Sequence, residues 1–277
     1  MKDEQCVELL QRMLPQLGFR WDGFKKVRNQ VCKRISRRFQ EVGVRSIDEY
    51  IQYVNTHDKE WDVLYSFCYA TVSKFYRDKR VYDIIGRELL PGFAERNQNS
   101  DNKIRIWSAG SCSGEEPYTI SILWKIRVAE QVESLPELEI VATDFKQMLI
   151  ERAEEGEYPE SSLQDLPGEL IEKAFEYKDD LYILKDEFKK PVNFVHQDIR
   201  ETMSVGSFSM IFCRNLVFTY FSLNHQSAIL QQLLNRLRPG GYIIIGEHEE
   251  LPDETGLERH PESPCIFRKI QSGDSDN

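Results

Sequence analysis

The sequence of 277 residues contains no apolar run that approaches the roughly 20 residues of a membrane-spanning helix. Its first residues, Met-Lys-Asp-Glu, lack the apolar stretch of a secretory signal peptide. No repeat or low-complexity segment interrupts the chain, and only residues 273–277 are expected to form a disordered tail. These absences predict a cytoplasmic protein that does not insert into membranes.

Cysteine pairs of the Cys-x-x-Cys type and His/Cys clusters with metal-ligand spacing are also absent. The cysteines are scattered along the chain, at Cys6, Cys32, Cys68, Cys112, Cys213 and Cys265. This scatter predicts reduced thiols and no metal site.

Positive charge is in deficit, because 36 lysines and arginines face 46 aspartates and glutamates, for a net charge of -10. Polyanions repel such a chain at long range, which argues against general binding to nucleic acid or anionic lipid. Any anionic partner therefore needs a local basic patch. The hydrophobic fraction of 40% is that of a globular protein with a core, and the length favours two domains.

Hydrophobic periodicity divides the chain into two parts. Residues 1–80 show apolar positions at three- and four-residue spacing, which predicts an N-terminal all-helical domain. A stretch of turn formers at residues 96–103 follows, so the two domains are expected to meet between residues 80 and 103. Residues 81–272 alternate short apolar runs with amphipathic helices, the pattern of a parallel α/β sheet covered on both faces.

The second domain is predicted to contain five parallel strands, at residues 103–109, 138–143, 192–197, 208–213 and 241–246. Helices are expected between them, at residues 115–131, 146–155 and 223–237. A last strand at 265–270 follows a loop too short for a crossover helix, so it is expected to run antiparallel at or near the sheet edge.

The segment 157–191 breaks this alternation and is predicted to be a small inserted flap. It carries a short helix near residues 167–175 and a hairpin-like run, Leu181-Tyr182-Ile183-Leu184. Only residues 176–180 separate that helix from the strand. The hairpin is therefore expected to have a short, charged tip.

The strongest local signal is a strand that runs into a small-residue loop and then a helix, over residues 104–118. Gly110 and Gly114 let a ligand approach the backbone, and the helix that follows presents free N–H groups. The loop is neither Gly-x-Gly-x-x-Gly nor a phosphate loop. On glycine content alone, an ordinary tight turn explains it equally well.

Acidic residues follow the next two strands. Asp144 lies about 30 residues after the glycine loop, where a carboxylate can accept both hydroxyls of a ribose. A helix N-cap is the competing role, but the loop upstream favours the ribose. Asp198 follows the third strand at the same sheet edge, where it can accept from an adenine amine or serve as a solvated loop residue.

Several ordered segments resemble the CheR-type chemotaxis-receptor methyltransferases over nearly the whole chain. These segments are Trp107-Ser108-Ala109 through Gly114-Glu115-Glu116-Pro117-Tyr118, Ala142-Thr143-Asp144, Ile211 to Asn215, Val72 to Asp78, Leu237 to Tyr242, and Gly246 to Glu249. The resemblance implies a Rossmann-like class I methyltransferase sheet behind the helical domain. It also implies transfer of a methyl group from S-adenosylmethionine to a receptor glutamate, giving the γ-methyl ester and S-adenosylhomocysteine.

The resemblance implies roles for individual residues as well. Arg77 faces the reacting methyl group and Tyr220 stands near it as a second catalytic residue. The loop and Glu115 hold the methionine end of the cofactor, Asp144 takes the ribose, and Asp198 flanks the adenine. The full set of implied cofactor contacts is Thr71, Ser73, Arg77, Ala109, Gly110, Gly114, Glu115, Asp144, Phe145, Asp198, Ile199, Asn215 and Leu216.

An ionised glutamate is already a nucleophile at pH 7, so this reaction needs no general base, and the donor fork of Arg77 suits a substrate carboxylate. Without the resemblance, Arg77 is explained by an ion pair with Asp78, and Tyr220 by packing beside Phe218 and Phe221.

The chain departs from the usual family pattern at three places. Thr71-Val72-Ser73 stands where relatives read Asn-x-Ser/Thr, one extra residue precedes Tyr220, and Asp198 replaces an asparagine.

Residues 24–40 are basic in an acidic chain, because they contain no aspartate or glutamate. Their basic residues are Lys25, Lys26, Arg28, Lys33, Arg34, Arg37 and Arg38. At about 100° per residue, Lys26, Lys33 and Arg37 fall opposite the apolar stripe of Val27, Val31, Ile35 and Phe39. A solvated helix face explains this charge, and so does binding of an acidic helical protein substrate.

Two other functions fit the same residues: a methyltransferase that acts on another protein or a small carboxylate, and a non-catalytic regulator that senses S-adenosylmethionine. The protein is expected to be a monomer with a chemotaxis receptor as its partner. In some members of the resembling family a longer flap loop docks a peptide at the receptor C-terminus, and the short tip here predicts that such docking is absent.

Overall fold

The computed structural model describes residues 3–69, 73–97, 103–252 and 256–270. The chain divides into two compact units, the smaller made of residues 1–71 and 217–226 and the larger of residues 72–216 and 227–277. The expected boundary near residue 80 thus lies inside the larger unit. The predicted tail, residues 273–277, and Thr71 lie outside the described residues. None of the described helices is long and apolar enough to cross a membrane.

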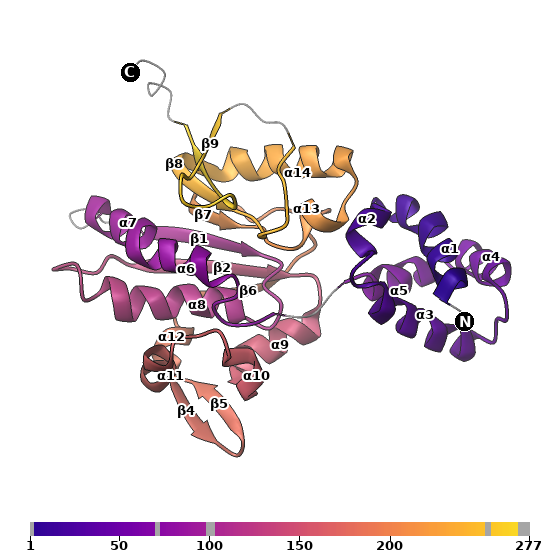
Figure 1. Cartoon of the computed structure of the whole chain (residues 1–277), viewed down its shortest axis with the longest axis horizontal. Helices are drawn as coiled ribbons and strands as arrows, with labels where there is room; N and C mark the ends of the chain where they lie inside the picture. Colours follow the sequence, from indigo (N-terminus) through magenta and orange to yellow (C-terminus); the bar gives the residue numbers. More distant parts are fainter. Residues whose placement is uncertain (1–2, 70–72, 98–102, 253–255, 271–277) are drawn as a thin grey trace. The chain divides into compact units, whose positions relative to one another are not determined.

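Short helices build the smaller unit (Figure 1). They are α1 (Asp3–Met13), α2 (Trp21–Phe24), α3 (Arg28–Val42), α4 (Ile47–Thr56), α5 (Lys59–Phe67) and α13 (Val217–Tyr220), with a 3-10 turn at Leu14–Leu17. On α3 the predicted apolar stripe is buried through Val31, Ile35 and Phe39. The helix begins at Arg28, so Lys26 lies in the turn before it.

Cys6 of α1 and Cys32 of α3 form a disulfide, with their Cα atoms 5.8 Å apart. The prediction of reduced thiols is therefore wrong for this pair. The packing of α1 against α3 brings together two cysteines that lie 26 residues apart and share no recognisable spacing. Cys112 and Cys265 are not disulfide-bonded.

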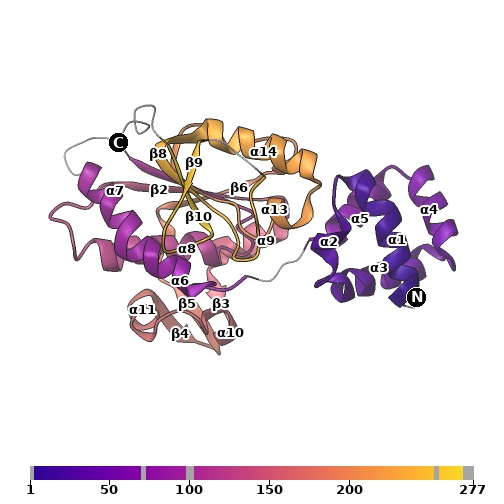
Figure 2. The ribbon, with the colours of Figure 1, turned by 45° about the horizontal axis from the view of Figure 1, so that its top comes forward.

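A seven-stranded sheet with the order β6-β2-β1-β7-β8-β10-β9 forms the centre of the larger unit (Figure 2). Its strands are β1 (Ile104–Ala109), β2 (Leu138–Asp144), β6 (Val192–His196), β7 (Phe208–Phe212), β8 (Leu237–Ile244), β9 (Leu257–Arg259) and β10 (Ile266–Lys269). The strands from β6 to β8 are parallel to one another. Strand β10 runs antiparallel to β8, and β9 runs antiparallel to β10. Strand order reverses between β1 and β7, and open α/β folds bind ligands at the carboxyl ends of strands at such a switch point.

The predicted parallel strands are all present, and β8 differs most in its start. It begins at Leu237 instead of residue 241, because Phe208 pairs with Leu237 but Met210 pairs with Tyr242, so residues 238–241 bulge from the ladder. The predicted last strand, β10, runs antiparallel beside β8 as expected. The outermost strand β9 was not predicted.

Helices cover both faces of this sheet. They are α6 (Lys79–Ile84), α7 (Leu90–Asn97), α8 (Glu115–Leu123), α9 (Gln147–Glu155) and α14 (Leu223–Arg236), with π-helical turns at Ile85–Leu89 and Trp124–Val128. Figures 1 and 2 show α8 and α14 on opposite sides of the strands. Because both faces are covered, β7 is buried along its whole length, Ser209 included.

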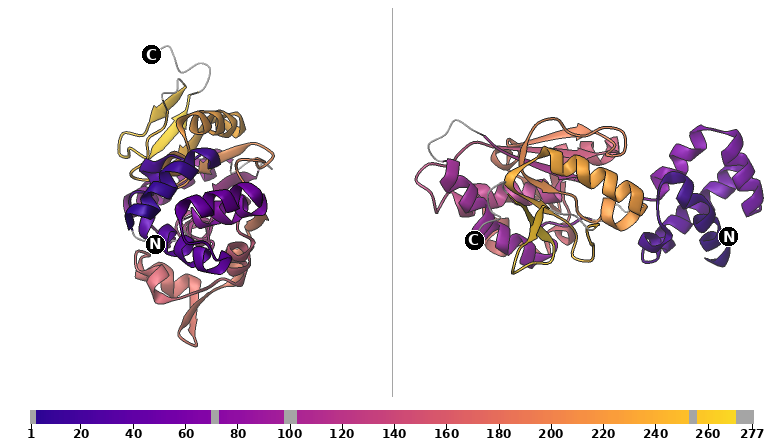
Figure 3. Two further views of the ribbon diagram at one scale, coloured as in Figure 1. Left: turned by 90° about the vertical axis from the view of Figure 1, so that its right-hand side faces the viewer. Right: turned by 90° about the horizontal axis from the view of Figure 1, so that it is seen from above.

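The inserted segment forms the predicted flap, a three-stranded sheet of order β3-β5-β4. Its elements are β3 (Glu157–Tyr158), α10 (Glu160–Leu163), α11 (Gly168–Ala174), β4 (Phe175–Lys178), β5 (Leu181–Leu184) and α12 (Asp186–Lys189). Figure 3 shows the β4–β5 hairpin projecting from the main sheet. The expected linker at 176–180 is mostly strand, because Asp179 and Asp180, at φ of 51° and 61°, close a two-residue turn.

Candidate active site

The glycine loop after β1 lies at the switch point of the sheet. The N–H groups of Gly110 and Ser111 donate to the carbonyl oxygen of Thr143, at 2.8 and 2.9 Å, and so join the loop to the end of β2. Gly110 has a φ of 80°, and a Cβ atom there would lie 2.7 Å from Cδ2 of Leu216. Only glycine fits this position, where the loops after β1 and β7 meet.

Asp144, the last residue of β2, turns its carboxylate toward this loop. Oδ2 accepts from the N–H of Cys112 at 3.0 Å, and Oδ1 accepts from the N–H of Lys146 at 2.9 Å. Burial raises the pKa of Asp144, and backbone bonds from Lys146, Cys112 and Phe145 oppose that rise. A carboxylate has about four acceptor positions, so the backbone does not exhaust its capacity to accept from a ligand hydroxyl.

Glu115, the first residue of α8, is 2% exposed. Burial raises the pKa of its carboxyl group. Hydrogen bonds from its own backbone N–H and from the hydroxyls of Ser73 and Ser113 lower the pKa and so oppose that rise. Within the described part of the chain, Oε2 of Glu115 and Oγ of Ser111 are buried without a hydrogen-bond partner. Buried polar atoms are nearly always bonded, so these two fit a ligand that brings its own donors, such as the amino group of S-adenosylmethionine.

The carboxylate of Glu249 holds the loop after β7. This residue belongs to the Gly246–Glu249 motif, and no role for it was predicted from the sequence. Glu249 accepts from the N–H groups of Asn215, Leu216 and Gly246, at 2.8, 3.1 and 2.7 Å. Asn215 has a φ of 53°, a left-handed conformation that is uncommon outside glycine. Glu249 therefore fixes the loop that faces Gly110.

Arg214 is a second residue that the sequence analysis did not assign, and its side chain is only 4% exposed. Its Nη1 donates to the hydroxyl of Tyr82 at 3.0 Å and to Glu116 at 3.1 Å. Its Nη2 donates to the carbonyl oxygen of Arg77 at 2.9 Å and to the carboxylate of Asp78. Burial by itself would lower the pKa of Arg214, but its anionic and phenolic neighbours raise it.

Arg77 thus sits on a segment that Arg214 anchors to the end of β7. The flanking residues Tyr76 and Asp78 have φ of 59° and 64°. Left-handed non-glycine residues persist only where their surroundings hold them, and they gather at functional sites. The Arg77 charge reaches the loop, because it lowers the pKa of Cys112, which burial otherwise raises well above its usual value.

The expected adenine contacts lie after β6. Gln197 donates its N–H to the carbonyl oxygen of Asp144 at 2.9 Å, so this segment adjoins the end of β2. The carboxylate of Asp198 accepts from Arg200, both from its backbone N–H and from its guanidinium. Ile199 is buried, and the carbonyl oxygen of Phe145 accepts from His196 at 2.7 Å.

The remaining predicted residues belong to the smaller unit. Tyr220 is 7% exposed and packs on Phe24 with ring centroids 4.9 Å apart. Lys26, Lys33 and Arg37 are exposed.

Two basic neighbours on α3 have structural roles instead. Arg34 donates to the carbonyl oxygens of Phe67 and Tyr69, and Arg38 forms an ion pair with Glu60. Within the described ranges, Lys26, Lys33 and Arg37 form no ion pair, so their charges are open to solvent.

Two family profiles match this chain. The one described as CheR methyltransferase, SAM binding domain, covers residues 71–266, and the one described as CheR methyltransferase, all-alpha domain, covers residues 25–67. A chemotaxis protein methyltransferase of Borreliella burgdorferi is 31% identical over 231 residues, 81% of each chain. One of Listeria innocua is 31% identical over 198 residues, 71% of this chain and 72% of its own. The chain therefore belongs to the CheR family of S-adenosylmethionine-dependent methyltransferases.

Proposed function

We propose that the protein methylates glutamate side chains of chemotaxis receptors, forming γ-methyl esters. The observation that carries this proposal is the pair of buried acceptors without partners, Glu115 Oε2 and Ser111 Oγ, beside the loop at the switch point. Relatives named chemotaxis protein methyltransferase, which match most of the chain, support the receptor as substrate.

When bound, S-adenosylmethionine supplies a sulfonium methyl group that an ionised carboxylate can attack in line. The residues of this chain then have to position the two reactants and exclude water. Asp144 accepts from the ribose, Glu115 accepts from the amino group of the cofactor, and Arg77 donates to one oxygen of the substrate carboxylate while the other attacks. No side chain has to move a proton, because glutamate is ionised at pH 7.

Transfer of labelled methyl groups tests this proposal. The protein is incubated with labelled S-adenosylmethionine and receptor-rich membranes, receptor-free lysate, or no acceptor. Label confined to the receptor bands supports the proposal. Label on other proteins or on a small carboxylate would reassign the substrate, and absence of transfer despite cofactor binding would indicate a regulator.

The exposed basic residues of the smaller unit provide the first prediction. Reversal of Lys26, Lys33 and Arg37 to glutamate is expected to raise the receptor KM roughly tenfold at low salt, because the face would repel an acidic substrate. Cofactor affinity should not change, and the difference in KM should shrink at high salt. A matched reversal of Lys103, Lys173 and Arg259, exposed on the larger unit, serves as the control. Equal KM values for the two triple variants would mean that the face is only solvated.

The short flap hairpin provides the second prediction. The open edge of β4 offers unpaired N–H and C=O groups, but the turn beside it consists only of Asp179 and Asp180. A docked receptor tail would find no loop to hold it. Methylation rates are therefore expected to be equal for receptors with and without their C-terminal tails, measured at matched receptor concentration. A large loss of rate on removal of the tail would contradict this expectation.

A further inference from the structure

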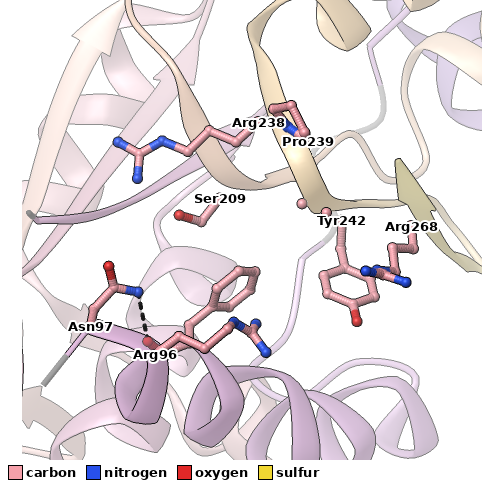
Figure 4. A pocket seen from close by; sticks show the side chains of 10 residues that line it. Arg96, Asn97, Ser209, Arg238, Pro239, Tyr242 and Arg268 are labelled. Carbon is pink, nitrogen blue, oxygen red and sulfur yellow. Dashed lines mark hydrogen bonds between the residues drawn. The ribbon is translucent and has the colours of Figure 1, made fainter. Parts of the chain in front are cut away.

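A pocket of about 360 Å³ lies on the larger unit, at the edge of the sheet opposite the glycine loop. Figure 4 shows the side chains that line it. Ser209, near the start of β7, and residues 238–242, at the start of β8, line it, whereas the cofactor loops follow the carboxyl ends of β1 and β7. At about 3.3 Å per residue, the length of β7 separates the two places by roughly 15 Å. The pocket is therefore distinct from the cofactor site.

The bulge of β8 forms one wall of this pocket. Residues 238–241 leave the ladder between the Phe208–Leu237 and Met210–Tyr242 pairs. A Cβ atom on Gly241 would lie 2.8 Å from the carbonyl oxygen of Ser209, so glycine is required where the bulge crosses β7. The Leu237–Tyr242 motif thus builds this wall, at the opposite end of the parallel strands from the glycine loop.

The lining is strongly basic. Arg96 of α7, Arg238 of β8 and Arg268 of β10 line the pocket from three elements, and no aspartate or glutamate lines it among the residues that the structure describes. This concentration stands out in a chain with a net charge of -10. Within the described ranges neither Arg96 nor Arg238 forms an ion pair with a carboxylate. Their charges are therefore available to an anionic ligand.

The other lining groups indicate what kind of anion fits. Phe93 and Tyr242 meet edge to face with ring centroids 5.9 Å apart, and the guanidinium of Arg96 lies 4.9 Å from the Phe93 ring. Guanidinium forks bind phosphate oxygens in pairs. The volume falls in the range of about 300–1,000 Å³ typical of small-molecule sites. We propose that the pocket is a second ligand site, which binds a diphosphate group, either free or carried by a nucleotide.

Titration calorimetry on the full chain tests this proposal. One arm uses pyrophosphate with neither cofactor nor receptor present, so its failure would leave the proposed methyl transfer untouched. The other arm uses adenosine diphosphate, with saturating S-adenosylhomocysteine to fill the cofactor site. We expect saturable binding that weakens with added salt. Tighter binding of adenosine diphosphate would identify a nucleotide as the source, and equal affinities would identify the free diphosphate.

The variant Arg96→Gln/Arg238→Gln is expected to weaken pyrophosphate binding at least tenfold, because two charge-assisted contacts are lost. Arg87→Gln is the matched control, since Arg87 is an exposed arginine of the same unit that pairs with Glu262. Arg238→Lys keeps the charge but loses the fork, so an intermediate loss of affinity is expected. This variant replaces the double variant in the test if the double variant does not fold. The proposal is overturned if neither ligand binds up to about 1 mM, if the double variant binds as well as the control, or if adenosine binds as tightly as its diphosphate.

Discussion

Replacement of Arg77 by alanine is expected to lower the rate of methyl transfer by about 10- to 100-fold while cofactor affinity stays nearly intact. The side chain is assigned to the substrate carboxylate, and the loss of one charge-assisted hydrogen bond corresponds to that range. The anchor of the segment should survive, because Arg214 bonds to the carbonyl oxygen of Arg77 and not to its side chain.

Single-turnover transfer to receptor measures the rate of the Arg77→Ala variant, and calorimetry with S-adenosylhomocysteine measures its cofactor affinity. Arg77→Lys, which keeps the charge and loses the fork, should recover part of the rate. Arg80→Ala removes an exposed arginine of α6 nearby in the chain and should leave the rate unchanged. Full transfer by Arg77→Ala would refute the assigned role.

Replacement of Asp144 by alanine is expected to weaken binding of S-adenosylmethionine and S-adenosylhomocysteine by about 1.5–3 kcal/mol, the range of a hydrogen bond to a charged group. Calorimetry gives this difference directly. Asp144 also accepts from the N–H of Cys112, so part of the loss would come from a loosened glycine loop.

The variant Asp144→Asn keeps one backbone acceptor through its amide oxygen, but its NH2 group cannot accept from the second backbone N–H, and it has no charge for the ribose. An intermediate affinity is expected. Asp165→Ala removes an exposed aspartate of the flap and serves as the control. Unchanged affinity in Asp144→Ala would remove Asp144 from the site.

The parts of the fold that the sequence predicts are those with strong local patterns. Apolar residues predominate in buried parallel strands such as β1, β2 and β7, which lie between turns, so their positions follow largely from the hydrophobic pattern. Strand β9 has three residues, of which two are charged, and offers no such pattern. The Cys6–Cys32 disulfide depends on how α1 packs on α3, which periodicity within each helix does not specify.

The candidate site follows the same division. Gly110, Glu115 and Asp144 could be proposed from the sequence because they lie at or within a few residues of the carboxyl ends of β1 and β2. The anchoring roles of Arg214 and Glu249 could not, since their partners are distant in the sequence, as in the contact of Arg214 with Asp78. A charged residue close behind a buried strand, as Arg214 is two residues after the end of β7, was the one available signal. The ion pair of Asp198 with Arg200 is a local interaction that was not predicted from the sequence.

The chemical nature of the transferred label tests the central claim most directly. Receptor labelled by the protein from radioactive S-adenosylmethionine is isolated, treated with mild alkali, and assayed for volatile label. Methyl esters of glutamate hydrolyse under these conditions and release labelled methanol, so nearly all of the label is expected to become volatile. Label that stays on the receptor after alkali would mean methylation of nitrogen or sulfur, and it would contradict the assignment of the protein as a glutamate methyltransferase.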